Sequence, residues 1–387
     1  MPIYHRLGDL PRKRHTAHRK PGGGLHHEEL MGNYGFSGPS SLLYHLGMPT
    51  RVREVQQLKE LDREADSDRR LRMRHLRTER LAKGGSPTLD RVPLLFNADC
   101  EIQFVEADQQ DSHYFRNGDG DEYIFVAGGA GALESPFGEI PFVEGDQLVI
   151  HRGILYRLRI ELGPLKLLIV QSRGYLRWPR RYCTDQGQLK EGAPFSERDI
   201  KRPQQLITHD EVGDFELLVK KEGILNRVIL DHHPCDVVGW DGYYYPWAFN
   251  IEDFEPIVGT VHLPPPIHQI LECEGFVMCN FMPRPYDFHP KAVPAPYNHS
   301  NVMSDEVLYY ASKDFMSRKG IEFGSITLHP DGLPHGPHPG RYESSVGKPG
   351  TDERAIMIDT FRALKVSIPA LAVEDPDYLT SWLGDPS

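Results

Sequence analysis

The sequence predicts a mainly β protein made of two barrel-like domains in tandem. Glycine and proline are abundant, at 36 and 32 of 387 residues, and many of them end short apolar runs, as turn residues do between strands. Those runs are rich in Val, Ile, Leu, Phe and Tyr, which strands favour. Only one long stretch has the spacing of an amphipathic helix. These three observations exclude a helical bundle and favour a turn-rich β fold.

Residues 1–90 are expected to form an N-terminal arm followed by an amphipathic helix. The first 25 residues are polar, basic and end in glycines. The helix would cover residues 51–83, end at the Gly and Pro of residues 84–87, and have an apolar face made of Val55, Leu58, Leu61 and Ala65. Six arginines between positions 69 and 80 could bind nucleic acid. Neighbouring acidic residues favour a solvated or intersubunit helix face instead.

Two sets of short strands follow this N-terminal region. The first barrel is expected over residues 91–207, from runs such as EIQFVEA, EYIFVAGG and QLVIHRGILYRLRI. The second is expected over residues 208–387, from runs such as FELLVKKEG, RVILDHH, EVLYYASKD and AIMIDTF, and it ends in an acidic tail. The two sets are not similar enough to be a sequence repeat.

The overall charge and the cysteines restrict the partners and the compartment. A net charge of −11 and a pI near 5.9 argue against nucleic acid or an anionic membrane as the main partner. Five scattered cysteines without a CxxC motif suit a reducing compartment. No run approaches the ~18 apolar residues of a membrane helix, and the basic N-terminus has no apolar core of a signal peptide. A cytoplasmic protein is expected.

Histidines gather in the second set of strands and raise a metal hypothesis. The chain has 19 histidines, and a segment rich in Pro and Gly holds His262, His268, His289, His299, His329, His335 and His338. Imidazole is the commonest protein metal ligand and a frequent acid or base at neutral pH. Any single histidine in such a loop is more often a surface or hydrogen-bonded residue, so the argument depends on their grouping.

The stretch YNHSNVMSDEVLYY sharpens the metal hypothesis. His299 lies in a turn-like segment, and Asp305 and Glu306 stand where an apolar strand begins, so a histidine and one carboxylate can meet at one barrel end. His329 and His335, in ITLHPDGLPHGPHPG, are the candidates for a third ligand. Two histidines and one carboxylate with open positions form the facial triad of non-haem iron(II) oxygenases. Zinc accepts the same donors, so ligand type leaves the metal open.

Several motifs together resemble the homogentisate 1,2-dioxygenase family. VVGWDGYYYPWAFNIEDFEPI, PYNHSNVMSDE and LHPDGLPHGP occur in the order of the family's C-terminal half, and EGDQLVIHRGILYRL and QSRGYLRWP resemble its N-terminal barrel. The similarity runs from about residue 95 to about residue 365. The resemblance implies a bicupin with a degenerate first barrel and a catalytic second one, assembled as a homo-oligomer, a trimer or hexamer. It also implies Fe(2+) as cofactor and the conversion of homogentisate and dioxygen to maleylacetoacetate in tyrosine and phenylalanine catabolism.

The resemblance also implies an iron ligand set. Carried over by motif, the ligands would be His299, a carboxylate at 305 or 306, and His335. One extra residue separates His299 from the acid, compared with the family. Aligning EVLYYASKDF with the family's strand puts the ligand on Glu306 rather than Asp305, with the extra residue in the preceding turn.

Other residues take expected roles from the same resemblance. His262 in GTVHLPPP matches the family's acid–base histidine, and His262 or His329 would accept a hydroxyl proton from the substrate. The expected substrate-binding residues are Tyr297, Asn301, Phe315 and His329, and His329 would either face the substrate or lie behind the metal ligands. Phe315 stands where the family commonly has a substrate-contacting tyrosine. A related dioxygenase for another dihydroxy aromatic ring, and a metal-binding bicupin that acts as an isomerase or binding protein, are the alternative functions.

Overall fold

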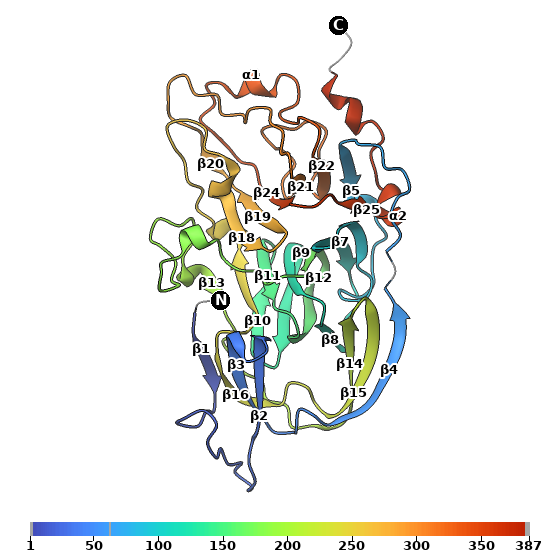
Figure 1. Ribbon diagram of the computed structural model, residues 1–387, viewed down its shortest axis with the longest axis vertical. Helices are drawn as coiled ribbons and strands as arrows, with labels where there is room; N and C mark the ends of the chain where they lie inside the picture. Colours follow the sequence, from blue (N-terminus) through green and yellow to red (C-terminus); the bar gives the residue numbers. More distant parts are fainter. Residues whose placement is uncertain (1–2, 62, 384–387) are drawn as a thin grey trace.

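The computed structural model describes residues 3–61 and 63–383. The ends of the expected arm and tail, at residues 1–2 and 384–387, lie outside the described residues, as does residue 62. The mainly β fold is confirmed, because strands dominate the described part and its helices are short (Figure 1). The helical segments are α1 (Arg341–Ser345), α2 (Ile368–Leu371), and the 3-10 turns η1 (Thr78–Arg80), η2 (Arg180–Tyr182), η3 (Glu197–Asp199), η4 (Ile251–Asp253), η5 (Pro265–His268) and η6 (Tyr378–Trp382).

The largest sheet has 13 strands and forms the middle of the molecule and its lower right part in Figure 1. Its strands are β4 (Val52–Glu60), β6 (Val92–Phe96), β7 (Cys100–Ala107), β8 (Tyr114–Asn117), β9 (Asp121–Ser135), β10 (Gly138–Phe142), β11 (Asp146–Ile150), β12 (Leu155–Ser172), β13 (Ile200–Lys201), β14 (Val212–Lys221), β15 (Ile224–His232), β17 (Trp247–Asn250) and β25 (Lys365–Val366). Because β14 pairs with β8 and β17 pairs with β11, this sheet continues past residue 207, the expected end of the first barrel.

A sheet of six antiparallel strands lies above it in Figure 1, in the order β18-β19-β24-β21-β22-β5. These strands are β18 (Gln269–Cys273), β19 (Phe276–Phe281), β24 (Ala355–Thr360), β21 (Asp305–Tyr310), β22 (Ser325–His329) and β5 (Arg74–Arg77). The pair β20 (Arg284–Pro285) and β23 (Gly350–Thr351) adjoins it. β5 comes from the N-terminal region, so this sheet is completed by a segment far away in sequence.

A four-stranded sheet lies at the opposite end of the molecule, in the order β1-β16-β3-β2 (Figure 1). Its strands are β1 (His5–Gly8), β2 (His27–Tyr34), β3 (Ser37–His45) and β16 (Val237–Gly242). The segment between β1 and β2 extends beyond this sheet as a long loop. The expected N-terminal arm is therefore anchored at both ends by strand pairing.

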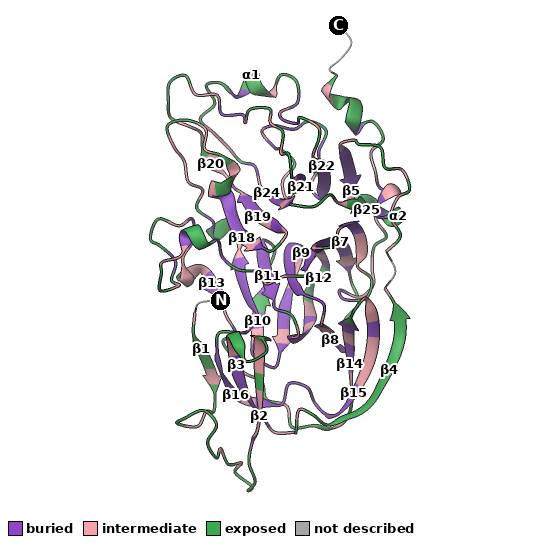
Figure 2. Ribbon diagram, viewed as in Figure 1, coloured by how far each residue is buried: buried purple, intermediate pink, exposed green. Residues whose placement is uncertain are grey.

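The expected helix over residues 51–83 is wrong. Residues 52–60 form the edge strand β4, which pairs antiparallel with β15. All nine β4 residues are exposed, as the green strand in Figure 2 shows. A helix here would find no core surface against which to pack its apolar residues. Strand β15, by contrast, offers a row of backbone hydrogen-bonding groups to the segment. Strand pairing therefore overrides a weak local preference for helix.

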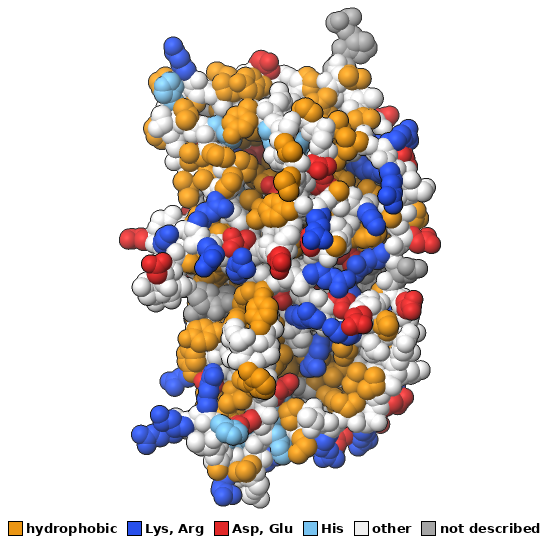
Figure 3. Space-filling view, viewed as in Figure 1, with side chains coloured by type: hydrophobic (Ala, Val, Ile, Leu, Met, Phe, Trp, Pro, Cys, Tyr) orange, Lys and Arg blue, Asp and Glu red, His pale blue; other side chains and the backbone are white. Residues whose placement is uncertain are grey.

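The arginines of this region form ion pairs inside the chain. Arg74 contacts Asp66 and Glu374, each at 3.0 Å, and Arg77 contacts Asp375 at 2.8 Å. On the face drawn in Figure 3, basic and acidic side chains are interspersed. The arginine run thus ties the N-terminal region to the C-terminal tail, rather than lining a helix face.

One large hydrophobic cluster extends from the first sheet into the second. It includes Ile124 and Leu168 of the large sheet and Phe276, Val307 and Ile358 of the six-stranded sheet. The six-stranded sheet therefore packs on a rigid core that holds its strand ends in place. In the described part of the chain, no helix is long and apolar enough to cross a membrane.

Candidate metal centre

The register of the six-stranded sheet brings three polar residues side by side. Strand β21 lies between β22 and β24, with Glu306 opposite His329 on one side and opposite Asp359 on the other. Directly opposed residues on neighbouring strands have side chains on the same face. A fixed register therefore places these three side chains together on one face of the sheet.

His299 and His335 come from two loops that are joined as a short antiparallel bridge. The His299 N–H donates to the His335 carbonyl at 2.8 Å, and the reverse hydrogen bond is 2.9 Å. Gly336 permits this approach, because a Cβ at that position would lie 2.1 Å from the Asn298 side chain. The two imidazole centroids are consequently 4.3 Å apart.

His299, Glu306 and His335 converge on one point. The distances from Glu306 Oε2 to His299 Nε2 and His335 Nε2 are 3.7 and 3.6 Å, and one donor atom from each residue lies within 4.8 Å of the others. His335 Nε2 is buried and has no hydrogen-bond partner among the described residues. A buried imidazole nitrogen without a partner is costly unless something binds it. The donor set and this unsatisfied nitrogen fit a divalent metal.

Asp305, the alternative carboxylate, points away from this centre. Its Oδ1 accepts the Asp331 N–H at 2.9 Å, and its Oδ2 accepts the Leu364 N–H at 2.6 Å. Neighbouring residues of a strand face opposite sides. Since both Asp305 oxygens are used by the backbone, Glu306 is the carboxylate that the fold presents to the two histidines.

His329 lies behind Glu306 and holds it in place. Its Nδ1 is 2.8 Å from Glu306 Oε1, and its Nε2 is 3.1 Å from the Tyr378 hydroxyl. Both ring nitrogens are thus occupied, and the side chain is fully buried. Burial first, and the nearby Arg318 charge second, lower the pKa of His329 to about 4. A neutral ring in this position can donate to Glu306 and accept from Tyr378.

The charges around Glu306 are balanced from several sides. Burial alone would raise the pKa of Glu306, but the contacts of its carboxylate with His299, His329 and His335 outweigh burial and hold this pKa well below its usual value. Arg318 adds a cation 3.5 Å from Glu306 Oε1. Burial, and then the Glu306 charge, raise the pKa of Asp359 to about 8. Glu306 is therefore the ionised member of this carboxyl pair.

A cavity of about 560 Å³ opens directly onto this centre. Of the residues expected at the site, it is lined by His262, Tyr297, His299, Asn301 and Glu306. His262 Nε2 is buried and has no hydrogen-bond partner among the described residues, and the ring packs edge-on against Tyr297 at 5.2 Å.

Phe315 and His329 are not brought to this cavity. Phe315 packs in a small hydrophobic cluster, with ring centroids 5.1 Å from Tyr310 and 5.9 Å from Phe281. His329 is screened from the cavity by Glu306 and contacts Tyr378 instead. The expected substrate contacts of these two residues are therefore replaced by packing and by positioning of Glu306.

The sequence of this chain is similar to those of known proteins. The family model described as Homogentisate 1,2-dioxygenase N-terminal matches residues 98–251. A Saccharolobus solfataricus protein named "Putative dioxygenase SSO1533" is 43% identical over 385 residues, 99% of each chain. Homogentisate 1,2-dioxygenase of Nitrobacter hamburgensis is 30% identical over 310 residues, 74% of this chain and 66% of that protein.

This chain belongs to the homogentisate 1,2-dioxygenase family. It spans 66% of the length of the Nitrobacter relative, and 99% of the length of the Saccharolobus protein. Among solved structures, a cupin 2 conserved barrel domain protein from Leptotrichia buccalis is similar over 74% of this chain and 96% of that chain. The TM-score is 0.35 and the sequence identity is 9%.

Three residues around the centre of this homogentisate 1,2-dioxygenase family member were not expected from the sequence. Asp359 could have been noticed in the sequence, because it is a carboxylate inside the apolar run AIMIDTF. Arg318 comes from an irregular loop, and Tyr378 comes from the tail, where a 3-10 turn follows an acidic stretch. No local pattern marks the last two, because only the folded chain brings them to Glu306 and His329.

Proposed function

We propose that this protein is an iron(II)-dependent dioxygenase that cleaves a dihydroxylated aromatic ring, with homogentisate as its substrate. The observation that carries this proposal is the His299–Glu306–His335 group beside a cavity of about 560 Å³, which His299 and Glu306 line. Two imidazoles and one carboxylate on one side of a metal leave positions open for substrate and dioxygen. Family membership supports the same reaction, in which both oxygen atoms enter the product, maleylacetoacetate.

Iron(II) held by these three residues would supply the redox chemistry through which dioxygen reacts with an aromatic ring, and zinc has no such chemistry. The chain's own residues have three tasks: to orient the substrate, to accept a proton and to keep the ligands in place. Each of these tasks can be assigned to a residue in the cavity wall or behind it.

His262 is the candidate proton acceptor. It lines the cavity, and its buried Nε2 lacks a partner among the described residues, so a substrate hydroxyl can donate to it. Burial lowers the pKa of His262, which keeps the ring neutral and able to accept a proton. Accepting the hydroxyl proton makes the aromatic ring more electron-rich.

Arg181 is the candidate partner for the carboxylate of homogentisate. It is the one Lys or Arg among the described residues that line the cavity. Its guanidinium already donates to the Pro266 carbonyl at 3.0 Å and to Gln269, which fixes its direction. A held guanidinium binds a carboxylate through charge-assisted hydrogen bonds. This cation distinguishes substrates with a carboxylate from plain diphenols.

His329 is a positioning residue in this scheme. Its hydrogen bond to Glu306 and its contact with Tyr378 leave no ring nitrogen for the substrate. Such partners fix the orientation of a metal-binding carboxylate. We expect a His329→Gln variant to bind iron more weakly while its KM for substrate stays close to that of the wild type.

Oxygen uptake by anaerobically purified, iron(II)-loaded protein tests the function. The substrates are homogentisate, gentisate and hydroquinone, and mass spectrometry after reaction with ¹⁸O₂ follows both oxygen atoms. We expect uptake with homogentisate, product carrying two labelled atoms, and no uptake by the zinc-loaded protein. Uptake only with another ring would replace the proposed substrate, and no uptake with any of them would overturn the dioxygenase proposal.

A further inference from the structure

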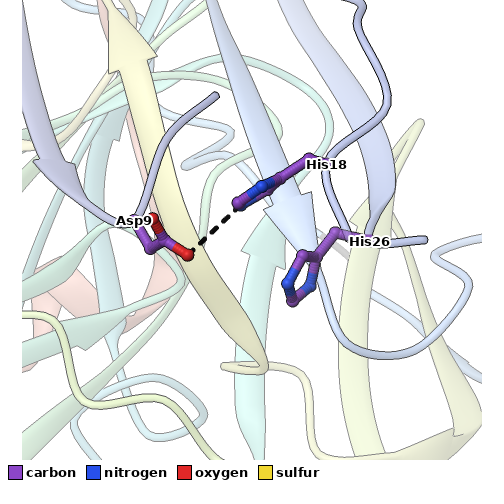
Figure 4. A group of neighbouring side chains, drawn as sticks. All are labelled: Asp9, His18 and His26. Atoms are coloured by element: carbon purple, nitrogen blue, oxygen red, sulfur yellow. Dashed lines mark ion pairs between the residues drawn. The ribbon is translucent and has the colours of Figure 1, made fainter. Parts of the chain in front are cut away.

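A second group of metal-binding side chains lies at the opposite end of the molecule, in the N-terminal arm. Asp9, His18 and His26 each offer one donor atom, and these atoms all lie within 4.8 Å of one another. Figure 4 shows the Asp9 carboxylate directed at the His18 ring, with the His26 ring beside it. This group shares no residue with the centre around Glu306.

Tight backbone packing fixes the position of Asp9. Asp9 follows β1 directly, and its N–H donates to the Val238 carbonyl at 2.8 Å. Gly239 opposes the end of β1, and a Cβ there would lie 2.1 Å from the Asp9 carbonyl oxygen. A Cβ on Gly8 would lie 2.2 Å from the Val238 oxygen. Two glycines therefore let this part of the arm lie against β16.

A small hairpin holds the two histidines across from each other. The His26 N–H donates to the His18 carbonyl at 2.9 Å, and Arg19 and Leu25 form an antiparallel bridge next to it. Gly23 and Gly24 have positive φ angles and close the turn between them. The imidazole centroids are consequently 4.5 Å apart.

Two imidazole nitrogens of this group lack hydrogen-bond partners among the described residues. His18 Nε2 and His26 Nδ1 are both buried, and neither has a hydrogen-bond partner among the described residues. The distance from His18 Nε2 to Asp9 Oδ2 is 3.5 Å. Two donors bound to one tetrahedral Zn²⁺, each at about 2.0–2.1 Å, lie about 3.3 Å apart. The distance between His18 Nε2 and Asp9 Oδ2 is therefore already close to ligand spacing, and no hydrogen bond within the described residues uses His18 Nε2 or His26 Nδ1.

We propose that Asp9, His18 and His26 form a second divalent-metal site, separate from the site around Glu306, with Zn²⁺ as its preferred ion. Two imidazole nitrogens and one carboxylate oxygen are a donor set that Zn²⁺ accepts, and water completes the tetrahedron. The Asp9 side chain is 75% exposed, so ion and water can reach the site from solvent. The buried His26 and the half-buried His18 form its inner wall.

The site has a structural role, because its ligands come from both ends of the arm loop. Asp9 stands at the end of β1, and His26 stands immediately before β2. A bound ion would join these two points through His18 and close the loop on the four-stranded sheet. Metal binding to the folded form alone raises its stability by mass action.

Metal titration of the full-length protein tests this proposal. The titration uses the Glu306→Gln background, in which we expect metal binding at the other centre to be weakened by more than ~100-fold. The protein is stripped with EDTA before titration with Zn²⁺ in a calorimeter. Titration with Co²⁺ adds a visible spectrum that reports tetrahedral coordination. We expect about one equivalent of Zn²⁺ to bind, and Asp9→Asn to weaken binding by at least the ~10–100-fold known for outer-shell partners. His18→Asn with His26→Asn should abolish binding.

A histidine of the same arm provides the matched control. The His15 side chain is 93% exposed and contacts Glu28, so His15→Asn should leave the Zn²⁺ stoichiometry and affinity unchanged. Asp9→Asn alters only an exposed carboxylate, and therefore tests the site even where the double variant fails to fold.

Two results would overturn the second site: no Zn²⁺ bound in the Glu306→Gln background, or equal affinity after Asp9→Asn. The oxygen-uptake assay is independent of this titration. Failure of the proposed dioxygenase function would therefore leave the second site intact, and the reverse also holds.

Discussion

Replacing the two adjacent carboxylates one at a time should separate metal binding from stability. In Glu306→Gln, the amide oxygen can still accept from His329 and Arg318, and the amide nitrogen takes the place of the oxygen that faces His299 and His335. An amide nitrogen does not bind iron. We therefore expect the variant to fold, to lose iron affinity by more than ~100-fold, which exceeds the effect of outer-shell changes, and to consume no oxygen.

The Asp305→Asn variant should show the opposite pattern. The two Asp305 oxygens accept the backbone N–H groups of Asp331 and Leu364, and asparagine can accept only one of them. A buried hydrogen bond to a charged group contributes about 1.5–3 kcal/mol. Because asparagine keeps one of the two bonds, we expect the free energy of unfolding to fall by about 1–3 kcal/mol, with iron binding and turnover retained.

Iron binding is measured as iron per chain by mass spectrometry after desalting. The free energy of unfolding is measured by urea denaturation of the iron-free proteins. The Asp9→Asn background restricts the iron count to the site around Glu306. Iron lost from the Asp305 variant and retained by the Glu306 variant would refute this reasoning, because it would place the ligand on the opposite face of β21.

Four further results are expected. Arg181→Met should raise KM for homogentisate by about 10–100-fold, since one charge-assisted contact is worth about 1.5–3 kcal/mol, and should leave the iron content and the kinetics with hydroquinone unchanged. Zinc-loaded protein should consume no oxygen at any substrate concentration. Phe276→Ala, at a fully buried core position, should lower the free energy of unfolding by about 3–5 kcal/mol. Burial alone would lower the pKa of His45, but ion pairs with Asp236 at 2.6 Å and Glu29 at 3.2 Å outweigh it and raise this pKa to about 9. The resulting stability is fully present below about pH 6.5 and lost as pH rises through 9. Asp236→Asn should reduce this pH dependence in denaturation curves, because Glu29 remains beside His45, and should cost about 3–5 kcal/mol at pH 6.5.

The strands were easier to predict than the N-terminal region for a physical reason. The runs YIFVA of β9 and LLIV of β12 are apolar and buried, so burial and strand preference point the same way. In β4 the two disagree, because its apolar residues follow a helical spacing while its backbone pairs with β15. An edge strand buries little, so the pattern of its side chains contains little information about its structure.

The predictable part of the metal centre was the set of residues that belong to short sequence motifs. His299, Glu306 and His335 belong to short motifs, and one strand decides between Asp305 and Glu306 once its register is known. The alternation of side chains in DEVLYY alone could not show which of the two carboxylates faces the histidines, because all six residues of β21 are buried. The sequence could not decide whether His329 faces the substrate or lies behind the ligands, since its position depends on Tyr378, which is 49 residues away.

Both chain ends contribute to the wall behind Glu306, and this makes the centre a property of the whole chain. The tail supplies Tyr378, whose hydroxyl contacts the His329 ring. The N-terminal region supplies β5, which pairs with β22, the strand that carries His329. Arg77 of β5 then forms an ion pair with Asp375 of the tail at 2.8 Å. The orientation of Glu306 depends on His329. The geometry of the metal ligands therefore depends on contacts between segments far apart in sequence, such as Arg77 and Asp375, which are about 300 residues apart.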